Sequence, residues 1–127
     1  MLEAMSQQGL IGAWEIDLTD QKFYWSSMTK VIYEVPLDFE PNLQSFINFY
    51  KEGESRQAIA TAIQIGIEQG IPWNLELILV TLKGKETWVT ATGQAEFKNE
   101  VCVRLFGSLQ DISELDILSG LKARRFS

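Results

Sequence analysis

Three consecutive strand patterns between residues 72 and 113 limit what this chain can fold into more than any other feature of its sequence. Over residues 75–82 apolar side chains occur at both odd and even positions, which indicates a strand buried at least in part on both faces. A turn around Gly84 separates it from an alternating run over residues 87–92, and a polar turn leads into a third run over residues 101–110. Short turns between neighbouring runs predict a three-stranded antiparallel meander.

The chain begins with a shorter strand pattern. Trp14, Ile16 and Leu18 alternate with acidic residues, and a polar turn leads to a second alternating run over residues 22–25. These two runs predict a short, aromatic hairpin.

Helices are expected between the hairpin and the meander. A short helix over residues 28–33 would turn Val31 to its apolar side, and a second helical pattern covers residues 43–50. The longest helical pattern covers residues 55–69 and is followed by Gly70, where a left-handed C-terminal cap is expected. Strands at both ends of the sequence with helices between them predict an α+β fold, in which the helices gather on one face of an antiparallel sheet.

The resemblance to a known family rests on five segments: Gly12-Ala13-Trp14-Glu15-Ile16-Asp17-Leu18, Trp25-Ser26, Pro72-Trp73-Asn74-Leu75-Glu76-Leu77, Gly84-Lys85-Glu86-Thr87-Trp88-Val89 and Gly107-Ser108-Leu109-Gln110-Asp111-Ile112-Ser113. With the order of predicted elements, they resemble a PAS sensory domain of the bacterial variety that starts with Gly-x-Trp and ends with an Asp-Ile-Thr type motif. The resemblance implies a five-stranded antiparallel sheet with short helices packed on one face. It implies a PAS domain over residues 11–113 and an N-terminal cap segment over residues 1–10. A generic α+β sandwich is the alternative.

Residues 114–127 look like the start of a linker toward an output domain. Residues 116–125 resemble the Asp-x-Leu-Thr-Gly-Leu-x-Asn-Arg-Arg segment that opens GGDEF diguanylate cyclase domains, with departures at Ser119 and Ala123. The Gly-Gly-Asp-Glu-Phe loop does not occur in the sequence, so no cyclase activity is expected from this chain. The alternative is an ordinary amphipathic exit helix capped by Ser113, and the two interpretations are compatible.

Composition argues against several partners and compartments. The formal charge of −6 at pH 7 disfavours a nucleic-acid partner, because affinity for a phosphate backbone comes largely from Lys and Arg. A single cysteine excludes an internal disulfide and suits a reducing compartment, and no apolar run reaches the length of a membrane span or a signal peptide. We therefore expect a cytoplasmic location and no membrane contact from this segment.

The common PAS cofactors are disfavoured by what the sequence lacks. It has no histidine, the usual haem ligand, and no cluster with the spacing of a metal site. PAS relatives that form a flavin photoadduct carry a cysteine in a helix before the meander, whereas Cys102 lies in the last predicted strand. Cys102 is interpreted as a small buried or half-buried residue, with a redox role as the alternative. The cofactor is therefore left unknown.

The inner face of the predicted sheet is the candidate ligand pocket. If the PAS face assignment applies, apolar side chains of the meander face the helices across a hydrophobic cup. The candidate pocket residues are Trp25, Phe46, Tyr50, Leu77, Leu79, Val89, Ala91, Leu105 and Leu109. Ligand sites normally add a few converging polar groups, and the inner face offers few. Plain hydrophobic core is the favoured interpretation, and a small apolar or aromatic ligand is the alternative.

The outer face of the sheet carries the candidate dimer contacts, which are Ile78, Val80, Leu82, Trp88 and Phe106. An apolar patch on a sheet face without helices is expected to be covered, and PAS domains typically use this face for dimerisation. We expect a homodimer. The alternative is a monomer in which the two ends of the chain cover the patch.

Asp111 and Ser113 match the PAS signature at the end of the last strand. A carboxylate and a hydroxyl at a strand-to-helix junction can accept backbone N–H bonds, which couples the strand to the segment after it. The resemblance implies a sensory module without enzymatic activity that relays a ligand or conformational signal to a covalently linked output domain, such as a diguanylate cyclase. A ligand-free dimerisation scaffold is the alternative, and a small enzyme acting through Glu76 or Asp111 is a third hypothesis.

Overall fold

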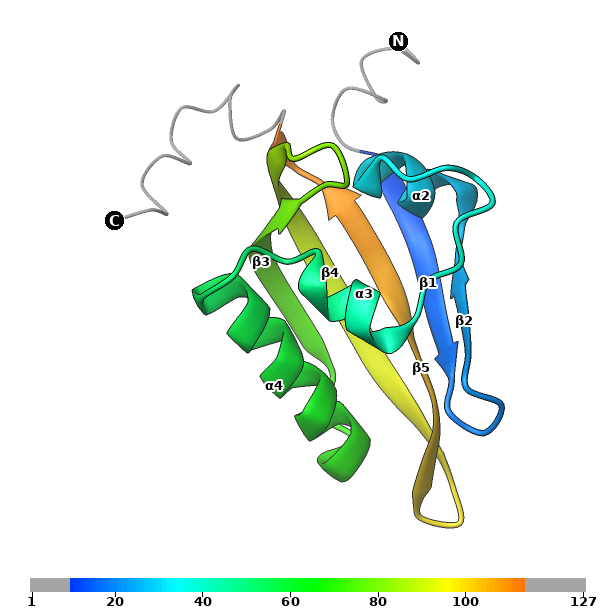
Figure 1. The fold of residues 1–127 in the computed structure, drawn as a ribbon. Helices are drawn as coiled ribbons and strands as arrows, with labels where there is room; N and C mark the ends of the chain where they lie inside the picture. Colours follow the sequence, from blue (N-terminus) through cyan, green and yellow to red (C-terminus); the bar gives the residue numbers. More distant parts are fainter. Residues whose placement is uncertain (1–9, 114–127) are drawn as a thin grey trace, which may run out of the picture.

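The computed structural model describes residues 10–113, which form one antiparallel sheet with three helices on one face (Figure 1). The strands are β1 Ile11–Asp17, β2 Lys22–Trp25, β3 Trp73–Val80, β4 Glu86–Lys98 and β5 Val101–Asp111. Their order across the sheet is β2-β1-β5-β4-β3, and every neighbouring pair is antiparallel. Pairing of β1 with β5 joins the N-terminal hairpin to the meander. The predicted α+β fold with a five-stranded antiparallel sheet is confirmed.

Two short helices start at polar caps. α2 (Ser27–Tyr33) follows Ser26, whose side chain accepts a hydrogen bond from the backbone N–H of Thr29. α3 (Leu43–Asn48) follows Asn42, which forms a reciprocal capping box with Ser45. Both helices lie where the sequence predicts them.

The longest helix of the described residues is α4 (Glu54–Gln69), with 16 residues. It ends at Gly70, whose φ of 73° is the left-handed conformation that glycine adopts without strain. None of the described helices is long and apolar enough to cross a lipid bilayer.

The hydrophobic core lies between the sheet and the three helices. α2 packs against β1 and β2, whereas α4 packs against β3, β4 and β5 (Figure 1). Ile59 and Ile63 of α4 are buried against the inner face, where Leu79 and Leu105 are fully buried. Burying one such side chain stabilises the fold by about 1.5–3 kcal/mol.

One expected side-chain direction is wrong, and one residue expected in a strand lies in a turn. Val31 is half exposed, because Thr29, Ile32 and Tyr33 are the residues of α2 that face the core. Leu82 lies beyond the end of β3, in the turn to β4, and its side chain is exposed. Its backbone N–H donates to the carbonyl oxygen of Tyr33 at 3.0 Å, so this turn is tied to the end of α2.

A β-bulge at Val103 changes the face of Cys102. Glu96 opposes Arg104, but the next residue, Phe97, opposes Cys102, so β5 contains one extra residue. Cys102 therefore shares the face of Phe97, whose ring lies beside the end of α4, and is buried. The sequence predicts strict alternation over residues 101–110, which would place Cys102 on the same face as Arg104. This prediction is wrong for the residues of β5 that precede Val103.

Residues 1–9 and 114–127 are outside the described part of the chain. The predicted exit helix and the GGDEF-like residues 116–125 lie there, as does the predicted N-terminal cap segment apart from Leu10.

Candidate functional site

Tryptophans and glycines form one row across the inner face of the sheet. The strand register places five residues side by side across the sheet. In order from β2 to β3 they are Trp25, Trp14, Gly107, Gly93 and Trp73. The indole rings of Trp14 and Trp73 stack with their centroids 6.0 Å apart. The Trp14 Nε1–H donates to the carbonyl oxygen of Thr92 at 3.2 Å. The two rings thus occupy the space that the glycines leave above the central strands.

The two glycines of this row have no room for a side chain. A Cβ atom added to Gly93 would lie 2.1 Å from a ring atom of Trp73, and one added to Gly107 would lie 2.0 Å from the carbonyl oxygen of Thr92. The centre of the predicted cup is therefore filled by protein. Sequence analysis missed this row, because only the pairing register shows that these residues lie side by side.

All nine predicted pocket residues are buried: Trp25, Phe46, Tyr50, Leu77, Leu79, Val89, Ala91, Leu105 and Leu109. Aromatic contacts link several of them to the rest of the core. The Phe46 ring lies 5.1 Å from that of Trp14 and 6.3 Å from that of Tyr50, and Trp25 stacks on Tyr33 at 4.2 Å, measured between centroids. This packing agrees with the core interpretation, and a ligand at these nine residues stays a prediction.

A cavity of about 450 Å³ lies to one side of this core, between the β1–β2 hairpin, α3 and α4. We call it the side cavity. Its lining residues are Ile16, Leu18, Gln21, Phe23, Pro41, Asn42, Leu43, Ile63, Ile67 and Leu105. Leu105 is the member of the predicted set that lines it. None of the lining side chains is charged, and the volume is within the range of small-molecule sites, about 300–1,000 Å³.

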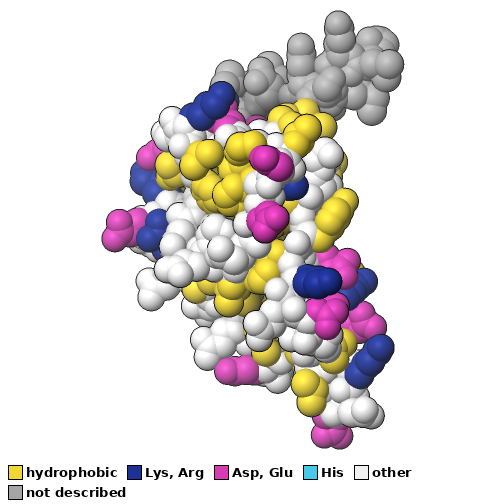
Figure 2. Space-filling view, turned by 45° about the vertical axis from the view of Figure 1, so that its right-hand side comes forward, with side chains coloured by type: hydrophobic (Ala, Val, Ile, Leu, Met, Phe, Trp, Pro, Cys, Tyr) yellow, Lys and Arg dark blue, Asp and Glu magenta, His cyan; other side chains and the backbone are white. Residues whose placement is uncertain are grey.

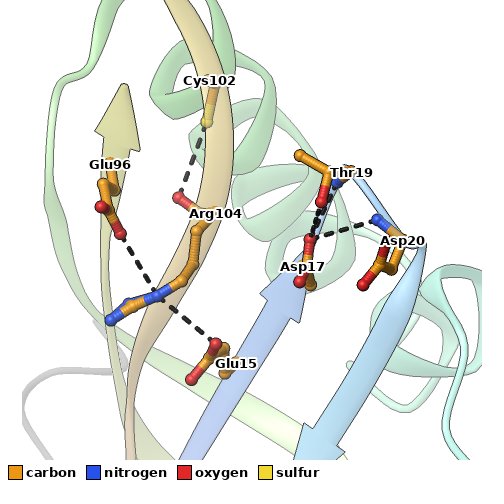
Figure 3. Close-up of polar contacts among 7 residues, drawn as sticks. All are labelled: Glu15, Asp17, Thr19, Asp20, Glu96, Cys102 and Arg104. Atoms are coloured by element: carbon orange, nitrogen blue, oxygen red, sulfur yellow. Dashed lines mark hydrogen bonds and ion pairs between the residues drawn. The ribbon is translucent and has the colours of Figure 1, made fainter. Parts of the chain in front are cut away.

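The polar residues of the side cavity are Gln21 and Asn42. Gln21 follows a turn in which the Asp17 carboxylate accepts hydrogen bonds from the Thr19 hydroxyl at 2.6 Å and from the Thr19 backbone N–H at 2.9 Å (Figure 3). These bonds, led by the one from the hydroxyl, hold the pKa of Asp17 below its usual value. The Asn42 Oδ1 accepts from the backbone N–H of Ser45, which leaves the Asn42 amide N–H groups as donors.

The surface on this side of the molecule is mixed in character. In the view that brings the β1–β2 side forward, hydrophobic side chains reach the surface in separate groups with polar and charged side chains between them (Figure 2). Leu43, at 45% exposure, is one lining residue of the side cavity that reaches solvent.

Two tyrosine hydroxyls lie in the core. Tyr33 and Tyr50 are each 1% exposed, and this burial is the main cause that raises the pKa of both phenols above the usual value of 10. The Tyr50 phenol is close enough to add to the raised pKa of Tyr33, but among the described residues the Tyr33 hydroxyl has no partner in hydrogen-bond geometry. Both phenols are neutral at physiological pH, so they supply polarity to the core but no charge.

The predicted junction residues, Asp111 and Ser113, lie together with Thr87 of β4. The Thr87 hydroxyl donates to the Ser113 Oγ at 2.8 Å, and the Ser113 hydroxyl and backbone N–H both donate to the Asp111 Oδ1, at 2.5 and 3.0 Å. Thr87 is buried, and sequence analysis did not single it out. The one feature of the sequence that could have identified Thr87 is its hydroxyl at a position of β4 that faces the core. These bonds tie two strands to the first residue after β5 that forms helical backbone.

The predicted dimer residues do not form one patch. Ile78 opposes Trp88 at one corner of the outer face, next to Val80, and all three are half buried; we call these three residues the outer corner. Two polar rows separate this corner from Phe106, namely Thr90 opposite Gln110 and Thr92 opposite Ser108. Polar residues thus occupy the middle of β4 and β5 on the outer face, and a homodimer through the five predicted residues stays a prediction.

Phe106 is covered by a charged side chain. The guanidinium carbon of Arg104 lies 4.0 Å from the centroid of the Phe106 ring. The Arg104 Nε lies 3.4 Å from a carboxylate oxygen of Glu15 and 3.4 Å from one of Glu96 (Figure 3). Partly exposed pairs of this kind contribute about 0–1 kcal/mol each. Their effect here is to hold Arg104 over Phe106.

Cys102 is buried, as the core interpretation of this residue expects. Its Sγ donates weakly to the carbonyl oxygen of Arg104 at 3.7 Å (Figure 3), and burial raises the pKa of the thiol. A raised pKa lowers the thiolate fraction, and the thiolate is the reactive form.

Among the described residues, no group of three or more His, Cys, Asp or Glu side chains is placed to hold a metal ion.

No protein-family model matches the sequence, and the comparison with curated proteins gives no match. Solved structures do resemble the fold. A sensory box histidine kinase/response regulator from Burkholderia thailandensis aligns with a TM-score of 0.73 at 19% identity, covering 98% of this chain and 93% of that one. The N-terminal domain of a diguanylate cyclase with a PAS/PAC sensor from Marinobacter aquaeolei aligns with a TM-score of 0.72 at 14% identity, covering 81% and 95%.

A PAS domain from Colwellia psychrerythraea also aligns, with a TM-score of 0.65 at 16% identity, covering 89% of this chain and 96% of that one. These likenesses confirm the predicted PAS-like fold.

Proposed function

We propose that the chain is a sensory module of the PAS type, which relays a signal from its sheet to the residues that follow β5. The observation that carries this proposal is the hydrogen-bonded chain from Thr87 through Ser113 to Asp111. It fastens the beginning of the next segment to both β4 and β5. A displacement of either strand changes the geometry of these bonds. In this proposal the residues after Ser113 have two alternative positions relative to the sheet, and the displacement shifts the equilibrium between them.

The side cavity is the proposed site of the signal. Its lining is apolar and uncharged, with amides only at Gln21 and Asn42. Such a site suits a small, neutral ligand with an apolar body and one hydrogen-bonding group, because a charged group would lose hydration without gaining an ionic partner. Ile16 of β1 and Leu105 of β5 line the cavity, so an occupant contacts the same strand that ends at Asp111.

The proposed signalling unit is a homodimer joined to an output domain. The outer corner, formed by Ile78, Val80 and Trp88, supplies an apolar contact for a second copy. The structures with similar folds include a sensory box histidine kinase/response regulator and the N-terminal domain of a diguanylate cyclase with a PAS/PAC sensor, which supports a linked output domain for this chain. A diguanylate cyclase is the proposed output, since residues 116–125 resemble the start of such a domain.

A ligand-free dimerisation scaffold is the second candidate function. The observation that favours it is the filled centre of the cup, where Trp14 and Trp73 stack over Gly93 and Gly107. In this function the signal would come from a neighbouring domain.

Native mass spectrometry of the protein purified from its own organism tests the two functions. A dimer with a small non-covalent added mass is the result expected for a ligand sensor. A bare dimer that stays bare with apolar neutral compounds, such as decan-1-ol, would support the scaffold. A monomer would contradict both.

A further inference from the structure

The side cavity has an apolar buried part and a polar part on its solvent side. Ile16, Ile63 and Leu105 are at most 4% exposed and form the buried part. Gln21 and Asn42 are the two lining residues with polar side chains, and both are exposed. A ligand with an apolar chain and one polar group is therefore most stable with its chain inward and its polar group beside the two amides.

The capping box of α3 leaves Asn42 with hydrogen-bond donors only. The Asn42 Oδ1 accepts from the backbone N–H of Ser45 at 2.9 Å, and the Ser45 Oγ accepts from the backbone N–H of Asn42 at 3.0 Å. A flipped amide would bring the Asn42 NH₂ group against the Ser45 N–H, donor against donor, so the network fixes its orientation. Among the described residues no group accepts from the Asn42 Nδ2. Asn42 thus offers a ligand two N–H donors and no free acceptor.

The second amide, that of Gln21, is held at a position that glycine would adopt more easily. Its φ is 57°, in the left-handed region that is costly for a residue with a Cβ atom. The Asp17 carboxylate holds the preceding turn by accepting from the backbone N–H groups of Thr19 and Asp20, at 2.9 and 3.2 Å. Gln21 lines the cavity from this strained position. Its amide supplies a further N–H donor for the same acceptor.

We propose that the side cavity selects a neutral carbonyl compound, such as a long-chain ketone or ester, and binds its carbonyl oxygen through the amide N–H groups of Asn42 and Gln21. A carbonyl oxygen has two lone pairs and no proton, so it can accept from both amides. A carboxylate is less suited, because it would lose hydration without gaining a cation in the lining. The side cavity is the ligand site of the proposed function, on which this inference rests.

Calorimetric titration with undecan-2-one and decan-1-ol tests the carbonyl preference through one isosteric change. Asn42→Asp keeps an oxygen that accepts from Ser45, since Asp caps a helix as well as Asn does, but it exchanges the two N–H donors for an acceptor. Ketone binding should weaken, whereas the alcohol can donate its proton to the new oxygen. We expect the ratio of ketone affinity to alcohol affinity to fall about tenfold. Effects of the new charge on the apolar chain enter both affinities and cancel in the ratio.

Gln44→Glu is the matched control. It makes the same chemical change at an exposed residue of α3 that does not line the side cavity, and it should leave the ratio as in the wild type. Gln21→Glu removes the donor of the second amide without touching the helix cap, and it should lower the ratio in the same direction as Asn42→Asp. Ile67→Trp, which fills the cavity, should weaken binding of both compounds.

The infrared carbonyl stretch of bound undecan-2-one gives a second readout. Hydrogen bonding weakens the C=O bond, so the stretch should lie at a lower frequency in the wild type than in Asn42→Asp. The difference spectrum between ketone labelled with carbon-13 at the carbonyl and unlabelled ketone isolates this band from those of the protein.

Two results would overturn the carbonyl assignment alone. They are a ratio of affinities that is unchanged in both Asn42→Asp and Gln21→Glu, and a carbonyl frequency that is the same in the wild type and in Asn42→Asp. Either result leaves the side cavity as a ligand site. Failure of both compounds to bind the wild type would overturn the carbonyl assignment together with the ligand site of the proposed function.

Discussion

Trp73 of β3 lies directly over Gly93 of β4, so closely that a Cβ atom on Gly93 would come within 2.1 Å of the indole ring. The contact fixes the position of Trp73, which in turn stacks on Trp14 of β1. Two strands that are separated by β4 and β5 are thereby joined above the sheet, in addition to the backbone ladder.

Gly93→Ala should destabilise the fold by about 1–3 kcal/mol, because the added methyl group forces Trp73 out of its position. The measurement is the free energy of unfolding in urea. Gln94→Ala is the matched control. Gln94 is the exposed neighbour of Gly93 in β4, so this substitution should change the free energy of unfolding by less than about 0.5 kcal/mol. Equal stabilities of the two variants would show that the Trp73 ring has room to move.

Tyr33→Phe should leave the stability unchanged or raise it by about 1 kcal/mol, because it removes a buried hydroxyl that has no partner among the described residues. Burial raises the pKa of the folded Tyr33, whereas the unfolded phenol ionises near 10. The unfolded state therefore loses protons first, and the wild type should lose stability as the pH rises above 10. Tyr33→Phe should lose less over that range, while Tyr24→Phe, at an exposed position, should follow the wild type. A marked loss of stability in Tyr33→Phe at pH 7 would mean that the hydroxyl is hydrogen bonded.

Thr87→Val should remove the first bond of the junction at the cost of about 0.5–1.5 kcal/mol. The sheet should stay folded, and amide exchange at residues 111–113 should become faster. Thr90→Val, on the outer face of the same strand, is the control and should leave that exchange unchanged. In a full-length protein, Asp111→Ala or Ser113→Ala should uncouple the output domain, and a normal response of both variants would argue against the relay.

Ile67→Trp should fill the side cavity and weaken binding of decan-1-ol at least tenfold, measured by calorimetric titration. Ile71→Trp is the control, because Ile71 is half exposed just beyond α4 and does not line the cavity. If the two variants bind the alcohol alike, the side cavity is not its site.

Trp88→Glu should shift a homodimer to monomer by placing a charge in the outer corner. Sedimentation velocity over a range of concentrations measures the association constant. Leu82→Glu changes a residue of the same predicted dimer set that lies in the turn beyond β3, and it should have a smaller effect. An unchanged association constant in Trp88→Glu would remove the outer corner from the dimer contact.

Local signals in the sequence were sufficient to predict the elements of this fold. Alternation located the strands, the caps at Ser26 and Gly70 located helix ends, and all of these follow from interactions within a few residues. The PAS resemblance added that the five strands form one antiparallel sheet, whereas the order of the strands across that sheet was not predicted.

The arrangement of side chains across the sheet was harder to predict from the sequence. The row from Trp25 to Trp73 depends on pairing between residues far apart in the sequence, and the bulge at Val103 reverses the expected face of Cys102. The side cavity depends on how closely α3 and α4 approach the β1–β2 hairpin, which periodicity does not reveal. Only Leu105 of the predicted pocket lines it, because the other predicted residues were chosen for facing inward, and the best-packed inward positions leave no space.

The tryptophan row also gives the molecule an internal optical reporter. Trp14, Trp25 and Trp73 lie in one buried row, and the rings of Trp14 and Trp73 are close enough for their electronic transitions to interact. Any event that tilts β1 relative to β3 changes the angle between these two indoles. Near-ultraviolet circular dichroism of the unlabelled protein would therefore register movement of the sheet itself.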